Sequence, residues 1–301
     1  MAFKKAVRHA VKLKIGVQGP SGSGKTYGAL MLARHMVGPE GKIAVIDTEN
    51  GSASLYSDRT PFDVLDLTPP FTSKRYADAV AEAIEAGYDI IVIDSISPQW
   101  NGEGGILQRK EQLDAQGRGN SYTNWAAFSA EHTKFLQMIV DAPIHMIATL
   151  RSKSEYVVEQ NEKGKAVPRK VGMAAVQREG AEYEFSIVFD VSMAHGAQTT
   201  KDRTGLFPTD EVVDLANKKT GKRITDWLAS GVELPPVDLR PRLPGTAAKL
   251  GGYGGQAIAD VPTEALETIL KGFREVDPDK FSDIIETIGE ELANRAGSGE
   301  V

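Results

Sequence analysis

The chain has 301 residues, of which 41% are hydrophobic and 25% are charged, with a formal net charge of −6 and no cysteine. This composition is typical of a soluble globular protein, and the lack of cysteine excludes disulfide frameworks and thiolate zinc sites. The sequence contains neither an apolar run of the roughly 20 residues that span a bilayer nor the apolar core of a signal peptide, so we expect a cytoplasmic protein without a membrane partner.

The charge is unevenly distributed along the chain. Residues 1–14 hold five basic residues and no acidic one, residues 151–180 hold seven basic residues against four acidic ones, and residues 261–301 hold ten acidic residues against four basic ones. A protein that is acidic overall can present a basic track to a polyanion. The alternative is that both basic stretches are solvated loops, and charge alone leaves the two open.

The first 230 residues alternate between buried strands and amphipathic helices. The strands are expected at 13–18, 42–47, 89–94 and 144–150, and the helices at 25–36, 73–87 and about 124–140. This alternation predicts an α/β fold with a mainly parallel central sheet flanked by helices. Ligands of such sheets bind at the carboxyl ends of the strands, so the functional residues should lie just after each strand.

The remaining pattern divides the chain into four parts. A long strand-like run over 182–194 predicts a β-hairpin region whose turn is expected at 201–205, and two amphipathic helices are expected near 263–274 and 278–294. The predicted parts are a basic N-terminal segment (1–14), an α/β core (15–232), a Pro/Gly-rich linker (233–260) and an acidic helical tail (261–301).

The stretch "GPSGSGKT" carries the strongest chemical signal. It matches G-x-x-x-x-G-K-S/T and lies between a predicted strand and a predicted helix, as that phosphate-binding motif requires. Backbone N–H groups are expected to cradle the β-phosphate, with Lys25 bridging the β- and γ-phosphates and the Thr26 hydroxyl on Mg²⁺. ATP and Mg²⁺ are therefore the expected cofactors, and the nucleotide-binding residues are Gly19, Pro20, Ser21, Gly22, Ser23, Gly24, Lys25 and Thr26.

Two carboxylates follow other strands of the predicted sheet. Asp94 ends "DIIVID" and is expected to be the second metal residue beside Thr26. Glu49 follows the 42–47 strand, where it would face the γ-phosphate and orient or deprotonate a water. The alternative for Glu49 is that it only caps a turn. Thr149, at the end of the 144–150 strand, is placed to sense the γ-phosphate through a hydrogen bond.

With Glu49 after the second strand and no acid directly after Asp94, residues 12–230 resemble the RecA-like, recombinase-type branch of P-loop ATPases. The pattern looks closest to phage-encoded single-strand annealing proteins built on a bare RecA-like core. The resemblance implies a DNA-stimulated ATPase that binds single-stranded DNA and forms a homo-oligomer, either a ring or a helical filament. For a phage protein it also implies the bacterial host cytoplasm.

The resemblance assigns roles to three further residues. Tyr56 is similar to the aromatic residue that stacks on adenine, although a packing role is the alternative. Lys201 and Arg203 in "KDRTG" are similar to paired cations that reach the nucleotide of the neighbouring subunit, and an ordinary polar turn is the alternative.

The same family binds DNA with the loops after its third and fourth strands. Here these are residues 97–124 and 151–180, which we expect to be mobile when empty. Trp100 and Tyr122 in the first loop suit either base stacking or packing. The residues expected to bind DNA are Arg109, Lys110, Lys163, Lys165, Arg169, Lys170 and Arg178.

Three other functions compete with this interpretation. A small-molecule kinase would need a helical lid, which 182–210 does not resemble, and a transporter ATPase would need a signature motif before Asp94 that the sequence lacks. A nucleic-acid-binding scaffold with incidental ATP turnover stays open. The acidic tail suits either a partner, such as a single-strand-binding protein, or competition with DNA for the basic loops.

Overall fold

The structure is a computed structural model. It describes residues 5, 8, 11–117, 120–160, 166–232, 243, 253–276 and 281–298. The chain divides into two compact units, Met1–Glu233 and Leu234–Val301. Lys163 and Lys165 lie outside the described residues.

The first unit is built on one sheet whose strands run in the order β3-β2-β4-β5-β1-β7-β8. All neighbouring strands in this order are parallel except β7 and β8, which are antiparallel. The strands are β1 (Lys14–Gly19), β2 (Ile43–Asp47), β3 (Asp63–Asp66), β4 (Ile90–Asp94), β5 (His145–Gln160), β7 (Ile187–Val191) and β8 (Ala197–Asp202).

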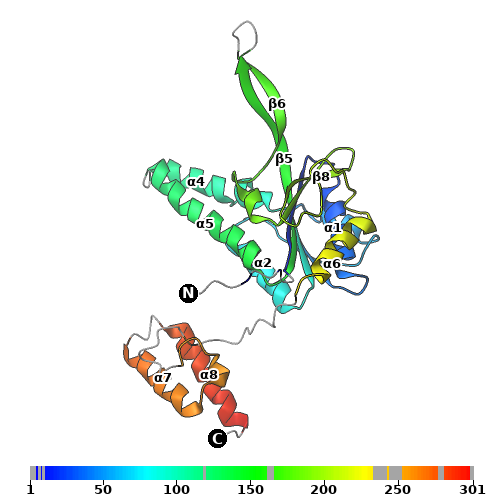
Figure 1. Cartoon of the computed structure of the whole chain (residues 1–301). Coiled ribbons are helices and arrows are strands. Elements are labelled where there is room, and N and C mark those ends of the chain that lie inside the picture. Colours follow the sequence, from blue (N-terminus) through cyan, green and yellow to red (C-terminus); the bar gives the residue numbers. More distant parts are fainter. Residues whose placement is uncertain are drawn as a thin grey trace. The chain divides into compact units, whose positions relative to one another are not determined.

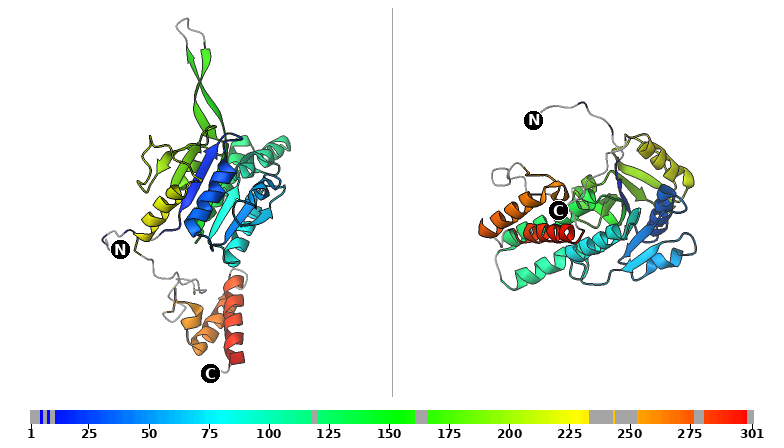
Figure 2. Two further views of the ribbon diagram at one scale, coloured as in Figure 1. Left: turned by 90° about the vertical axis from the view of Figure 1, so that its right-hand side faces the viewer. Right: turned by 90° about the horizontal axis from the view of Figure 1, so that it is seen from below.

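Helices cover both faces of this sheet, as the continuous apolar strands require. Every residue of β1, β2 and β4 is buried. One hydrophobic cluster joins the sheet to α1 (Lys25–Val37) and α6 (Lys218–Ala229), and a second joins it to α2 (Ser73–Glu85) and α5 (Ser121–Asp141). Figure 1 and Figure 2 show these two layers around the central strands. The predicted α/β fold with a mainly parallel, helix-flanked sheet is confirmed.

A two-stranded arm replaces the mobile loop predicted at 151–180. β5 continues far past the sheet and pairs antiparallel with β6 (Ala166–Ala175), so that the two strands project from the body (Figure 1). The prediction of an unpaired loop was wrong because the apolar run 156–158 and the segment 166–173 favour paired strands, and a ladder satisfies their backbone groups. The mobility of this segment stays a prediction.

The other predicted mobile loop, 97–124, is mostly helical. It forms α3 (Ser97–Asn101), α4 (Ile106–Ala115) and the first turn of α5. A capping box of Asn120 and Thr123 starts α5, a signal that sequence reasoning overlooked. The ring of Trp100 stacks on that of Trp125 with 5.8 Å between centroids, so Trp100 packs within the fold, whereas Tyr122 is 84% exposed.

The β7–β8 hairpin also differs from the prediction. The start of the predicted strand run 182–194 is a short helix, η2 (Ala181–Glu184). The turn of the hairpin lies at 192–196 rather than at 201–205. The "KDRTG" stretch instead ends β8, because the Asp202 carboxylate accepts hydrogen bonds from the backbone N–H of Thr204 at 2.7 Å and of Phe207 at 2.8 Å. Such local bonds favour a turn over a continued ladder.

The second unit is a small helical domain. It contains η4 (Ile258–Asp260), α7 (Thr263–Val276) and α8 (Ser282–Ser298), which pack through Leu266, Phe273 and Ile288. The predicted linker, 233–260, lies largely outside the described residues, and its last part, 253–260, belongs to this domain. Across the described residues, no helix combines the length and the apolar character that crossing a bilayer requires.

Candidate nucleotide site

The phosphate loop connects β1 to α1 at the carboxyl edge of the sheet. Gly24 precedes α1 in the left-handed conformation, with φ 89°, and no side chain caps the helix. The first N–H groups of α1 are therefore left for a ligand, together with the partial positive charge of the helix end. The hydroxyl of Ser23 is buried without a hydrogen-bond partner among the described residues, which fits a loop shaped for a polar ligand.

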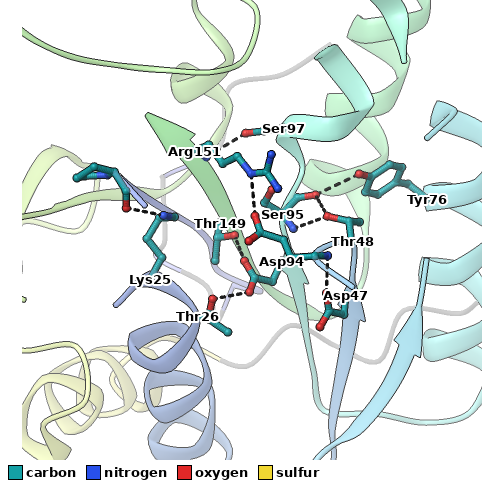
Figure 3. A network of polar contacts seen from close by, with 12 residues as sticks. Lys25, Thr26, Asp47, Thr48, Tyr76, Asp94, Ser95, Ser97, Thr149 and Arg151 are labelled. Atoms are coloured by element: carbon teal, nitrogen blue, oxygen red, sulfur yellow. Dashed lines mark hydrogen bonds and ion pairs between the residues drawn. The ribbon is translucent and has the colours of Figure 1, made fainter. Parts of the chain in front are cut away.

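Asp94 lies at the centre of a hydrogen-bonded network (Figure 3). Thr26 donates from Oγ1 to Asp94 Oδ2 at 2.6 Å, and Thr149 donates to Oδ1. The strand order explains this meeting, because β5 lies between β1 and β4, and Thr149 is the part of β5 that lies at the edge where β1 and β4 end. Burial raises the pKa of Asp94, and the hydrogen bonds from Thr149 and Thr26 lower it.

These oxygens fit Mg²⁺. The ion prefers oxygen ligands and is commonly held by one or two side chains plus substrate phosphates and waters. Thr26 and Asp94 supply such a pair beside the phosphate loop, and the described residues contain no cluster of three or more acidic, His or Cys side chains that would suggest an all-protein metal cage. When bound, Mg²⁺ would neutralise charge on the phosphate oxygens.

Glu49 is held in place by the end of β2. Asp47 accepts from the backbone N–H of Glu49 at 2.5 Å and from that of Ala53 at 2.8 Å, so its carboxylate organises the turn after the strand. The Glu49 side chain forms an ion pair with Arg151, with 2.9 Å between Oε1 and Nε. Both side chains line the same cavity as Asp94 and Lys25. Glu49 thus lies beside the phosphate loop, where the sequence placed it, and its role in activating water stays a prediction.

The contact between Arg151 and Glu49 was not predicted from the sequence. Arg151 follows the predicted sensor Thr149 by two positions, and that spacing alone was the available signal. Its backbone N–H donates to Ser97 Oγ at 3.0 Å and its carbonyl accepts from Val176 N–H at 2.6 Å. Arg151 therefore lies at the base of the arm and in the nucleotide site at once (Figure 3).

Lys25 folds back onto its own loop. Its Nζ donates to the Pro20 carbonyl at 2.9 Å. Burial lowers the pKa of Lys25, whereas the carboxylates of Asp94 and Glu49 raise it and Arg151 lowers it further. A triphosphate in the loop would supply the counter-charge that this partly buried ammonium lacks.

A cavity of about 1300 Å³ opens over the phosphate loop. The loop, Glu49 and Arg151 form one part of its wall, and the segment 212–218 before α6 forms another. Tyr56 ends η1 (Ser52–Tyr56), lines the cavity and contacts Tyr27 with 5.6 Å between ring centroids. Tyr56 is thus available to a base, and its stacking on adenine stays a prediction. Sequence reasoning missed Tyr27, the 212–218 segment and His195, which also lines the cavity.

Lys201 and Arg203 lie away from this cavity. Lys201 pairs with Val188, near the amino end of β7, so it stands toward the edge of the sheet opposite the phosphate loop. Lys201 Nζ and Arg203 both donate to the carbonyl of Tyr183, the latter at 2.7 Å. Neither residue lines the nucleotide cavity of its own chain.

The candidate DNA-binding residues have three kinds of surroundings. Arg109 forms two hydrogen bonds of 2.8 Å with Glu131, and Lys110 pairs with Asp114 at 2.5 Å, so both charges are matched within the fold. Arg178, at the base of the arm, donates to the Ser129 carbonyl at 3.4 Å. The two described basic positions of β6 lie in the ladder opposite Val157 and Tyr156; they are Arg169 and Lys170.

In the basic N-terminal segment, Arg8 packs against the end of α6 within the first unit. Arg8 donates to the Trp227 carbonyl at 2.7 Å and to Ser230 Oγ at 2.5 Å, and its guanidinium lies 4.5 Å from the Trp227 ring. Lys14 begins β1 and is buried, with Nζ donating to the carbonyls of Ala142 and Ile144. Burial, with a smaller contribution from Lys12, lowers the pKa of Lys14 to about 8.

A family model matches the part of the chain that contains this site. Residues 11–226 match the model of a family described as AAA domain. No curated protein matches the chain. Among solved structures, the chain is similar to a KaiC-like protein from Pyrococcus horikoshii, with 13% identity, a TM-score of 0.37, and coverage of 64% of this chain and 80% of that chain. Because the family match spans most of the chain and includes the phosphate loop, Asp94 and Thr149, the chain belongs to the AAA domain family, and its first unit is a P-loop ATPase domain.

Proposed function

We propose that the protein is a single-stranded DNA-binding ATPase of recombination or strand annealing, which assembles on DNA and hydrolyses ATP at subunit interfaces. The observation that carries this proposal is the arm. It leaves the body directly after Thr149 and Arg151, so any polymer bound along the arm is connected by one continuous strand to the nucleotide site.

The composition of the arm supports a polyanionic ligand. Lys170 lies opposite Tyr156 and Arg169 opposite Val157 in the β5–β6 ladder, and the sequence between the strands adds Lys163 and Lys165. Basic residues next to aromatic and apolar ones suit both phosphate neutralisation and contact with unstacked bases. Binding residues are often placed on segments that extend from a rigid scaffold, as this arm does.

The position of Lys201 and Arg203 supports assembly. These cations lie toward the edge of the sheet opposite their own phosphate loop, so they can reach a triphosphate only if another copy presents one. Head-to-tail packing, in which one edge of a subunit meets the opposite edge of the next, gives a ring or a helical filament. A cation supplied by a neighbour would make hydrolysis depend on assembly.

Within each site, the described residues divide the chemistry of hydrolysis. Lys25 and the loop N–H groups would bind phosphate oxygens, and Thr26 and Asp94 would hold Mg²⁺, which neutralises phosphate charge when bound. Glu49 accepts a proton from the attacking water once its carboxylate is released from Arg151. Thr149 holds Asp94 from the side of β5.

The decisive experiment measures ATP hydrolysis and binding to fluorescent poly-dT over a salt titration. For the double charge reversal Arg169→Glu and Lys170→Glu, we expect weaker binding and loss of DNA-stimulated hydrolysis. The slope of log K against log[salt] should become shallower by about 1.4, since each phosphate contact on a single strand contributes about 0.7. Lys74→Glu and Lys222→Glu form the matched control, since both lysines are exposed helix residues paired at i,i+4. Unchanged binding and stimulation in the arm variant would refute the DNA assignment.

Glu49→Gln separates an enzyme from an ATP-organised scaffold. If hydrolysis drives the activity, this variant binds ATP and poly-dT normally but loses turnover and repeated annealing, because the neutral amide cannot accept the proton. Full annealing by a variant without hydrolysis would favour the scaffold.

A further inference from the structure

The turn between β7 and β8 touches the phosphate loop, and His195 makes the closest polar contact. Its Nδ1 lies 2.9 Å from the carbonyl oxygen of Ser23. The ring also packs on the next residue of the loop, because a Cβ added to Gly24 would lie 3.1 Å from that same Nδ1. Nothing in the phosphate-loop motif itself includes this histidine, which is 171 positions further along the chain (195 minus 24).

The hydrogen bond determines the tautomer of the ring. A carbonyl oxygen only accepts, so Nδ1 must carry the hydrogen and donate it to Ser23. The peptide that follows Ser23 is planar, and its C=O and N–H groups point in opposite directions. A donor that fixes the Ser23 carbonyl on the His195 side therefore directs the Gly24 N–H to the other side.

The backbone of His195 indicates that this placement is not incidental. Its φ is 65°, in the left-handed backbone region that residues other than Gly, Asn, Asp and His rarely adopt. Unfavourable backbone conformations persist where the surrounding structure enforces them, and they often occur at functional sites. Here the turn is enforced by two backbone hydrogen bonds of 2.9 Å, from Ser192 N–H to the Gly196 carbonyl and from His195 N–H to the Ser192 carbonyl.

We propose that His195 is a positioning residue of the nucleotide site: its Nδ1–H holds the Ser23–Gly24 peptide so that the Gly24 N–H is presented to a bound phosphate. This inference rests on nucleotide binding at the phosphate loop and is independent of DNA binding and assembly. The β7–β8 hairpin is thereby part of the phosphate site, although it follows the loop by far in sequence.

Two substitutions separate the hydrogen bond from the backbone conformation. His195→Asn tolerates the left-handed region and keeps a side-chain N–H, whereas His195→Gly tolerates that region and removes the donor. Gln198→Ala is the control in the same hairpin, because Gln198 is exposed and does not line the nucleotide cavity. The readout is the Kd for a fluorescent ADP analogue, measured without DNA, together with Tm and the split of hydrolysis between KM and kcat.

We expect His195→Gly to weaken nucleotide binding about fivefold to tenfold, the equivalent of one hydrogen bond, while His195→Asn stays within about threefold of the native protein. KM should rise in proportion, with kcat and Tm little changed. A native Kd for His195→Gly, or equal losses for the Gly and Asn variants, would overturn the proposal. The proposal would also be overturned if ¹⁵N NMR of the histidine rings in the native protein placed the hydrogen of His195 on Nε2.

Discussion

Arg151 and Glu49 form an ion pair of 2.9 Å that joins the base of the arm to the carboxylate expected to activate water. The Arg151 side chain is 51% exposed and that of Glu49 is 29% exposed, so the pair is accessible to both nucleotide and solvent. While the pair is intact, one carboxylate oxygen of Glu49 is occupied by the guanidinium rather than by a water. The arm contacts this pair through Val176, whose N–H donates to the Arg151 carbonyl at 2.6 Å, so a movement of the arm base that shifts Arg151 would break the pair.

Arg151→Ala should therefore raise hydrolysis in the absence of DNA. An exposed ion pair contributes roughly 0.5–1 kcal/mol, so we expect an increase of about twofold to fivefold and a smaller further stimulation by poly-dT. Steady-state phosphate release with and without poly-dT measures both effects. Arg59→Ala is the control, since Arg59 forms an exposed pair with Asp58. A fall in DNA-independent hydrolysis would show that Arg151 instead acts on the nucleotide.

Mixing two inactive variants tests catalysis across an interface. Glu49→Gln lacks the base but keeps Arg203, and Arg203→Ala lacks the cation but keeps Glu49. Each alone should lose about 100-fold or more of its activity, whereas an equal mixture should recover about a quarter of native activity, since random head-to-tail assembly pairs an intact site with an intact cation at one interface in four.

Phosphate release by the mixture, at concentrations where the protein is oligomeric, measures this recovery. Glu49→Gln mixed with Lys25→Ala is the control, because both defects lie in the nucleotide site itself, so every interface of this mixture contains a defective site and no recovery is expected. Native activity of Arg203→Ala alone, or an inactive mixture, would contradict catalysis in trans.

The positions of several nucleotide-site residues could be predicted from the sequence because each follows a short local pattern. The loop from Gly19 to Thr26 is one contiguous motif, Asp94 ends the apolar strand β4, and Thr149 follows the apolar stretch 146–148 of β5, so a parallel sheet brings them to one edge. The partners of these residues were harder to predict. The Arg151–Glu49 pair spans 102 positions, and side-chain direction at the end of a strand is not encoded in hydrophobic periodicity.

The arm and the β7–β8 turn show a second limit. The sequence of the arm, 151–160 and 166–175, lacks the simple apolar alternation on which strand prediction depends. The turn at 192–196 contains "SMAHG", in which a histidine rather than a glycine takes the left-handed position. Turn-forming residues in "KDRTG" therefore led to the prediction of the hairpin turn there. In the structure this stretch lies at the end of β8, where the Asp202 carboxylate accepts from the Thr204 N–H.

Arg109 connects the helical region after α3 to the helix that covers the sheet. Its guanidinium pairs with Glu131 through two hydrogen bonds, and Glu131 also accepts from Ser73 Oγ at 2.7 Å. This contact lowers the pKa of Glu131 and raises that of Arg109. Arg109→Ala should lower the free energy of unfolding by roughly 1–2 kcal/mol, because it leaves a half-buried carboxylate with one partner.

Urea unfolding of the native protein and of Arg109→Ala measures this loss. Lys74→Ala is the matched control, since Lys74 forms an exposed i,i+4 pair with Asp78, for which a change below about 0.5 kcal/mol is expected. Equal stability of the two variants would mean that the bidentate pair is no stronger than an exposed one.

The lowered pKa of the buried His145 makes the free energy of unfolding depend on pH. Burial, with smaller contributions from Lys12 and Lys14, lowers its pKa to about 4, and its Nδ1 accepts from the Leu13 N–H at 3.1 Å. The unfolded chain, with an ordinary histidine pKa of about 6.5, binds a proton in the interval where the folded chain does not. Stability is thus unaffected by His145 above pH 6.5 and falls as the pH drops from 6.5 to 4.

His145→Asn removes this titration and keeps an acceptor for Leu13. We expect the native protein to lose roughly 2 kcal/mol more stability than the variant between pH 7.5 and pH 4.5. Urea unfolding followed by tryptophan fluorescence isolates the first unit, because all three tryptophans, Trp100, Trp125 and Trp227, lie in it. Burial also lowers the pKa of His132, whose contribution is common to both proteins and cancels in the comparison. Parallel losses in the two proteins would mean that His145 is protonated without cost in the folded state.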